Sequence, residues 1–167
     1  YNNKLGLDYY GQRIGCNFKD DVSGRLIFNV GQINFIENTI KTTINIRYPV
    51  TKNKDEVIEG IKKAVEKDDV YIDLKNHQKP LYVPKDDPLV QNLMNVYREI
   101  TGDNESTPIA IGGGTYARAV PKGVAFGALF PGDKELAHQK DEYIKIDDLY
   151  KNTLIIASAI KALASKE

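Results

Sequence analysis

The sequence has few of the residues that form covalent crosslinks or bind metals. Cys16 is its one cysteine, which excludes an internal disulfide and favours a reducing compartment, here the cytoplasm. Its two histidines, His77 and His138, form no HxxxH pair, and no CxxC pair occurs. These shortages exclude both a disulfide scaffold and a zinc motif contained within one short stretch.

The sequence also lacks a charge imbalance and long apolar runs. Lysine plus arginine number 23, as do aspartate plus glutamate, so charge gives no argument for a nucleic-acid or membrane partner. No apolar run approaches the ~20 residues of a membrane span, and no secretory signal is visible. The 167 residues, 41% hydrophobic and 28% charged, are typical of a globular protein with one ordinary core or two small ones.

The first part of the chain, residues 1–80, has the pattern of an antiparallel sheet with one helix. Residues 25–35 are rich in β-forming residues, with Gly31 a candidate bulge or turn, and residues 40–47 alternate apolar and polar side chains with a period of two. The expected elements are strands over residues 25–35 and 39–50 joined near Glu37 and Asn38, a helix around residues 57–65 with Asp55 in its first turn, and a strand over residues 70–74. The order β-β-α-β predicts a small α+β domain with a helix packed on the sheet.

The second part, residues 81–167, has a different pattern. Asp87 and Pro88 are a helix start and Gly102 is a helix end. Short apolar runs then precede and follow a glycine turn, which is typical of α/β layering. The expected elements are a helix over residues 88–101 buried through Leu89, Leu93, Val96, Tyr97 and Ile100, strands over residues 107–111 and 124–130, the latter buried on both faces, and a helix capped near Asp147 with Leu149, Ile156, Ala159, Ile160 and Leu163 available for burial.

The most informative short motif is "GGGTYAR", residues 112–118. Bare glycine backbone can approach a ligand closely, Thr115 adds a hydroxyl, and Arg118 can form a bidentate contact with a carboxylate. The spacing matches neither a P-loop nor a GxGxxG fingerprint, so phosphate binding is not supported. The structural alternative is a tight turn between a strand and a helix.

Three isolated side chains are weaker candidates. His138 lies in a polar loop, where a solvated surface histidine is the common alternative. Arg47 belongs to the polar face of an alternating strand, which suits either recognition across a cleft or an ordinary surface arginine. His77, between Lys75 and Lys79, is interpreted as a surface or hinge residue.

Taken together, these blocks resemble the C-terminal portion of a metallopeptidase of the aminoacylase/carboxypeptidase clan (family M20), in particular the bacterial PepV-type dipeptidases. The similarity extends from about Arg25 to the end of the chain. The motifs that carry it are "NIRYPV", "YVPKDDPLVQNLMNVYREITG", "IGGGTYARAVPKGVAFGALFPG" and "AHQKDEYIKIDDL".

The resemblance implies a fold and a set of roles. Residues 1–80 would be the C-terminal part of an α+β lid domain, and residues 81–167 the C-terminal part of an α/β catalytic domain. The implied cofactors are two divalent metal ions, zinc or manganese, and the implied substrate is a short peptide. The implied metal ligand is His138, and the implied substrate-binding residues are Arg47, Gly113, Gly114, Thr115 and Arg118.

The sequence departs from the family pattern in lacking an HxD block and a GDEE-like block. The resemblance therefore places the other metal ligands and the general-base glutamate in an N-terminal remainder of the same protein. It implies no catalytic residue in this chain, which alone is expected to be inactive. Two alternatives stay open: a sister activity of the clan (deacylase, desuccinylase or carboxypeptidase), and a non-catalytic binding or interaction fragment.

Overall fold

The computed structural model describes residues 3–127 and 129–165, which fold as two compact units. The first unit extends to Leu81 and includes Ala110–Gly112, and the second holds Tyr82–Ile109 and Gly113 onwards. The described elements are two antiparallel two-stranded sheets and three α-helices. Within these residues, no helix combines the length and apolarity needed to cross a membrane.

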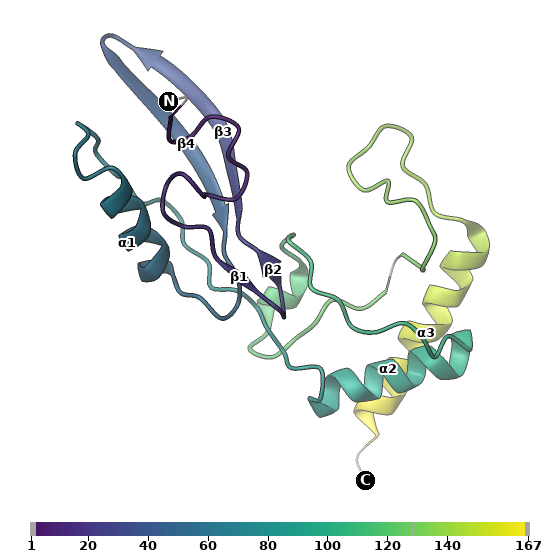
Figure 1. Ribbon diagram of the computed structural model, residues 1–167. Coiled ribbons are helices and arrows are strands. Elements are labelled where there is room, and N and C mark those ends of the chain that lie inside the picture. The colour runs from purple at the N-terminus through teal and green to yellow at the C-terminus, as the bar shows by residue number, and fades with distance from the viewer. Residues whose placement is uncertain (1–2, 128, 166–167) are drawn as a thin grey trace. The chain divides into compact units, whose positions relative to one another are not determined.

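A long hairpin dominates the first unit (Figure 1). Strand β3 (Ile27–Ile36) pairs antiparallel with β4 (Thr39–Arg47), and the turn between them includes Glu37 at a positive φ of 52°. A smaller hairpin joins β1 (Lys19–Asp20) to β2 (Gly24–Arg25). The alternating pattern of the sequence and the turn near Glu37 are thus confirmed.

The expected bulge at Gly31 is confirmed and has a clear consequence. The register shifts between Val30 and Gln32, so Val30 lies opposite Ile44 whereas Ile33 lies opposite Thr42. Since directly opposed residues share a face, the extra residue keeps the apolar residues of β3 on one face although their spacing changes. Phe28 and Val30 pack into the core on this face, whereas Phe35 further along is 72% exposed.

Helix α1 (Lys54–Ala64) covers the part of the hairpin next to β2 (Figure 1). Asn53 caps it in a capping box: its side chain accepts from the Glu56 N–H, and the Glu56 carboxylate accepts from the Asn53 N–H, both at 3.0 Å. The core it closes also includes the loop before β1. The buried members of this core are Ile14, Cys16, Leu26, Phe28 and Val57.

The second unit contains a helix pair. Helix α2 (Pro88–Thr101) begins after Asp87, whose carboxylate accepts from the Leu89 N–H at 2.9 Å, and ends at Gly102 in the left-handed conformation. Its expected apolar stripe packs against helix α3 (Ile146–Ala164). The buried residues of this core are Leu93, Val96, Ile155 and Ala159.

Three expected strands are absent from the described residues. Residues 70–74 and 107–111 are irregular and pair with no described strand, and Tyr71 and Ile109 are 90% and 83% exposed. Residues 124–127 and 129–130 are also irregular. Their half-buried side chains contact the α2–α3 core, but Leu129 is 54% exposed, so burial on both faces is wrong. Each run has strand-like composition, but a strand forms only where a neighbouring backbone accepts and donates its hydrogen bonds.

Helix α3 also differs from expectation in its cap and its buried face. Its N-cap is Lys145, which makes no side-chain cap, and Asp147 lies inside the first turn. Ala159 is buried as expected, together with Asn152 and Ile155. The other four residues expected at the core are 45–63% exposed: Leu149, Ile156, Ile160 and Leu163. The helix is therefore apolar on two sides, of which the α2 contact covers one.

We predict that Gly60→Ala destabilises the first unit, although alanine favours a helix over glycine by about 1 kcal/mol. A Cβ on Gly60 would overlap the Gly15 carbonyl oxygen, and one on Gly15 would lie 2.5 Å from the Gly60 carbonyl oxygen. Both partners are backbone, so neither can rotate away, and overpacking of this kind costs about 1–3 kcal/mol. Urea unfolding followed by circular dichroism measures the change.

Gly31→Ala is the matched control for this test, because its Cβ would meet the Thr43 carbonyl oxygen at an ordinary 3.8 Å. Its free energy of unfolding should stay within about 0.5 kcal/mol of wild type. A Gly60→Ala protein as stable as wild type would contradict the close packing of α1 on the loop that contains Gly15.

Candidate functional site

Arg47 is the last residue of β4 and projects from its polar face, as the alternation predicts. Its neighbours on that face, Thr43 and Asn45, are exposed, whereas Ile44 and Ile46 on the other face are half-buried. The guanidinium Nη1 donates a hydrogen bond to the carbonyl oxygen of Gly112 at 2.7 Å, within the first unit. The side chain is therefore exposed but held at its head group.

The backbone just after Arg47 is fixed by hydrogen bonds to the β1–β2 turn. The Asp20 carboxylate accepts from the Thr51 N–H and hydroxyl at 3.1 and 2.9 Å, and the Ser23 hydroxyl accepts from the Val50 N–H at 2.9 Å. Partial burial raises the pKa of Asp20, but hydrogen bonds from Ser23 and Thr51 outweigh it and lower that pKa to about 2. An ionised Asp20 thus anchors the segment that follows Arg47.

Tyr48 makes a second attachment at the end of β4. Its hydroxyl is hydrogen-bonded to Nε2 of His77 at 2.7 Å, and the two rings lie nearly parallel with centroids 6.0 Å apart. Burial, with the nearby charge of Asp55, raises the pKa of Tyr48. His77 is exposed, as expected for a surface residue, but its contact with Tyr48 across 29 residues has no signal in the sequence.

The glycine turn leads into a short 3₁₀ helix, η1 (Tyr116–Ala119), for which Thr115 is the N-cap. Among the described residues, no acceptor is found for the N–H groups of Gly113 or Gly114 and no partner for the Thr115 hydroxyl. A Cβ on Gly114 would lie 3.7 Å from Nε of Arg118, so these two residues are neighbours, whereas Gly113 faces open space. The turn thus presents unused donors beside a guanidinium.

His138 lies in a loop closed by the ion pair of Asp133 with Lys145. The hydrogen bond from Lys145 lowers the pKa of Asp133. His138 has a positive φ of 62°, a conformation in which histidine is enriched, and its N–H donates to the Glu142 carboxylate at 3.3 Å. Its side chain is exposed.

The described residues do not complete a metal site by themselves. No group of three histidine, cysteine, aspartate or glutamate side chains converges anywhere within residues 3–127 and 129–165. His138 fits the role of a single imidazole ligand because it is exposed on a loop that is fixed at both ends. The remaining ligands of any such site would have to come from outside this part of the chain.

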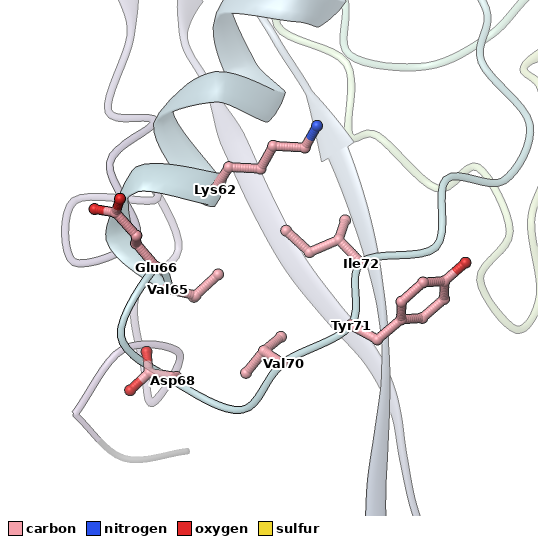
Figure 2. Close-up of a pocket in the computed structure, with 7 residues that line it drawn as sticks. All are labelled: Lys62, Val65, Glu66, Asp68, Val70, Tyr71 and Ile72. Carbon is pink, nitrogen blue, oxygen red and sulfur yellow. The ribbon is translucent and has the colours of Figure 1, made fainter.

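A hollow in the first unit lies away from the candidate site residues. A pocket of about 260 Å³ lies between the C-terminal end of α1 and the segment that follows it, and Figure 2 shows the residues that line it. Lys62, Glu66 and Asp68 supply its charges, and Val70 and Tyr71 are exposed at its side. It contains none of the candidate site residues, so we assign it no role in the site.

The chain is similar to known peptidases. The model of "Peptidase family M20/M25/M40" matches residues 10–162. "Putative dipeptidase YtjP" of Bacillus subtilis is 42% identical over 162 residues, and "Putative dipeptidase" of Staphylococcus epidermidis is 39% identical over 160. "Putative dipeptidase SSP1012" of Staphylococcus saprophyticus is 40% identical over 160 residues. These alignments cover 95–96% of this chain but 34% of each relative, so the chain spans about a third of their length.

We predict that Asp20→Asn weakens folding at neutral pH by about 1 kcal/mol, because an amide cannot accept all the hydrogen bonds of the carboxylate. The ordinary pKa of the group is 3.8 and its folded-state pKa is about 2. A carboxylate whose pKa is lowered by folding stabilises the fold at pH values above its ordinary pKa. This stabilisation is lost as the pH falls through the pKa of the folded state. The difference between wild type and variant should therefore shrink as the pH falls from about 4 to about 2.

Urea titrations at a series of pH values measure this difference. Asp21→Asn is the control: Asp21 is exposed, and we expect its variant to follow the wild-type pH profile. A difference for Asp20→Asn that stays constant down to pH 2 would show that the charge of Asp20 does not stabilise the segment after Arg47.

Proposed function

Because the chain belongs to peptidase family M20/M25/M40, we propose that the complete protein is a metal-dependent dipeptidase that hydrolyses the amide bond of short peptides. The similarity over residues 10–162, together with identities of about 40% to proteins named as dipeptidases, is the observation that carries this proposal. The short-peptide substrate and a cytoplasmic location are parts of the same proposal.

We assign residues 1–80 to the C-terminal part of a lid domain and residues 81–167 to the C-terminal part of a catalytic domain, each completed by the N-terminal remainder of the same protein. Two observations support packing of this chain against an N-terminal remainder. The apolar stripe of α3 that includes Ile156 and Ile160 is uncovered, and a helix apolar on two sides normally packs on both. Residues 107–111 have strand-like composition but no strand partner within the described part of the chain. Relatives about three times longer have room for the missing elements.

His138 is the proposed metal ligand in this chain, and the proposed cofactors are two divalent ions, zinc or manganese, since imidazole suits both. When bound, such ions activate a water molecule and polarise the scissile carbonyl. The general base would come from the N-terminal remainder, so no residue of this chain is assigned a proton-transfer role. The ion pair that closes the loop and the hydrogen bond from the His138 N–H would fix the backbone that carries the imidazole.

The substrate-binding roles follow from donor chemistry. Arg47 would bind the terminal carboxylate of the peptide, because a guanidinium fork matches a carboxylate geometrically. Gly113, Gly114 and Thr115 would line the carboxylate side of the substrate through donors that have no partner among the described residues. Arg118, next to Gly114, would add positive charge there.

Two other functions are distinguishable from this one. A deacylase, desuccinylase or carboxypeptidase of the same clan would share the metal chemistry but prefer a longer or acylated substrate. A non-catalytic binding fragment would show neither metal dependence nor turnover, and neither a nucleic acid nor a membrane is proposed as its partner.

We expect the complete protein to hydrolyse free dipeptides and to lose this activity when a chelator removes the metal. Residues 1–167 alone should show no turnover and weak metal binding, since one imidazole cannot form a multi-ligand site. Assays on a set of dipeptides, acylated amino acids and longer peptides measure the preference. Turnover by the isolated chain, or chelator-resistant activity of the complete protein, would contradict the proposal.

We expect His138→Ala in the complete protein to reduce bound metal and to lower turnover by more than about a hundredfold. Mutation of residues that only orient a metal ligand already costs about 10–100-fold in metal affinity or activity. The fold should persist, since the side chain is exposed. Lys140→Ala, whose side chain is 93% exposed in the same loop, is the matched control and should retain both metal and activity. Elemental analysis and circular dichroism separate these effects, and an unchanged metal content in His138→Ala would refute the ligand assignment.

A further inference from the structure

The Arg47 side chain uses one of its two Nη groups within the protein. Nη1 donates to the Gly112 carbonyl oxygen at 2.7 Å, a length typical of a charge-assisted hydrogen bond. Guanidinium presents five N–H donors in a rigid plane, and a carboxylate engages two neighbouring ones. With Nη1 occupied, the edge formed by Nε and Nη2 stays open, and no described residue accepts a hydrogen bond from it.

The same contact extends along the arginine stem. A Cβ on Gly112 would lie 3.3 Å from Nη1 and 3.9 Å from Cδ of Arg47, so the stem passes directly over the bare glycine. The same Cβ would lie 3.8 Å from Cδ1 of Ile27, the residue opposite Arg47 in the β3–β4 register. Glycine at position 112 therefore leaves the space that the arginine head and stem occupy. The φ of Gly112 lies outside the left-handed region, so space rather than backbone conformation favours glycine here.

The base of the side chain is fixed independently of its head. The backbone of Arg47 pairs with Ile27, the Thr51 segment is bound to Asp20, and Tyr48 is bound to His77. A long side chain with a fixed base still samples many rotamers unless its head is also held. The Gly112 carbonyl is the contact that holds it.

We propose that Gly112 is a positioning residue that fixes the Arg47 guanidinium with its Nε–Nη2 edge open to the carboxylate of the bound peptide. The inference rests on the proposed function for the identity of the ligand, but not for the contact itself. Holding the fork in place before binding lowers the ordering cost that the substrate would otherwise meet. The alternative is that the Gly112 carbonyl occupies the position of the peptide carboxylate in the free protein. In that case Arg47 would exchange the carbonyl for the carboxylate when the peptide binds.

Gly112→Val in the complete protein tests the inference because it keeps the carbonyl but fills the space of the guanidinium. We expect kcat/KM for a free-acid dipeptide to fall by about threefold to tenfold, mainly through KM. Outright removal of a hydrogen bond to a charged group would cost roughly tenfold to a hundredfold. The C-terminally amidated dipeptide, which has no carboxylate, should lose less.

A double-mutant cycle separates positioning from a general structural effect. If Gly112 acts through Arg47, the change in the free-acid to amide preference caused by Gly112→Val should disappear in an Arg47→Lys background. An equal loss on both peptides, or a change of preference that persists in Arg47→Lys, would overturn the inference. Tighter binding of the free acid by Gly112→Val would overturn it in favour of a displaced placeholder.

A spectroscopic arm keeps this test independent of activity. In the ¹⁵N-arginine-labelled complete protein, hindered rotation of the Arg47 guanidinium should be visible by NMR and should be lost in Gly112→Val. Gly113→Ala, where a Cβ would meet nothing within 4 Å, should leave that signal unchanged. If the complete protein hydrolyses no dipeptide, the proposed function fails, and this spectrum decides the contact alone: an Arg47 signal that is the same in wild type and Gly112→Val overturns it.

Discussion

The antiparallel pairing of β3 with β4 determines both where the first core forms and where Arg47 points. A strand alternates its side chains, so a shift of one residue would exchange the faces. The observed register places Phe28 opposite Ile46 against α1, and places Arg47 opposite Ile27 on the other face. The bulge at Gly31 preserves the apolar face where the spacing in β3 changes. The hairpin thus buries one face against α1 and carries the Arg47 guanidinium on the other.

The parts of the fold that sequence predicts well are those encoded locally. Helix α2 starts and ends where expected because Asp87 and Gly102 act on backbone groups within one turn of themselves. The hairpin is equally legible, since alternation and a turn lie in one continuous stretch. Residues 70–74 have the composition of a strand but no partner within the described residues, and composition cannot supply one. Helix α3 was correctly expected, but it is apolar on two sides, and periodicity alone does not say which side α2 covers.

For the site, the sequence indicated side chains rather than the contacts that hold them. Arg47 was identified by alternation and by family resemblance, and the structure supports its place on the polar face. Its contact with Gly112 spans 65 residues and goes to a backbone carbonyl, which no residue type signals. The same holds for Tyr48 with His77 and for the backbone packing of Gly15 on Gly60. Such contacts join residues that are distant in sequence, so they depend on the path of the whole chain and cannot be predicted from a local motif.

These contacts give a physical reason for arginine rather than lysine at position 47. An ammonium is a compact point charge on a flexible stem, so a hydrogen bond to the Gly112 carbonyl would not fix the direction of its remaining donors. A guanidinium is planar, so one bond at Nη1, with the stem packed beside Gly112, fixes the plane and leaves its opposite edge with a defined direction. Bidentate binding of a carboxylate, the role proposed for Arg47, uses two parallel donors at a set spacing, which a guanidinium fork supplies and an ammonium does not. Gly112 and Arg47 therefore act together. Gly112 provides the carbonyl acceptor and the space for the guanidinium, and the planar guanidinium, held by that one hydrogen bond, presents two further donors in a defined direction.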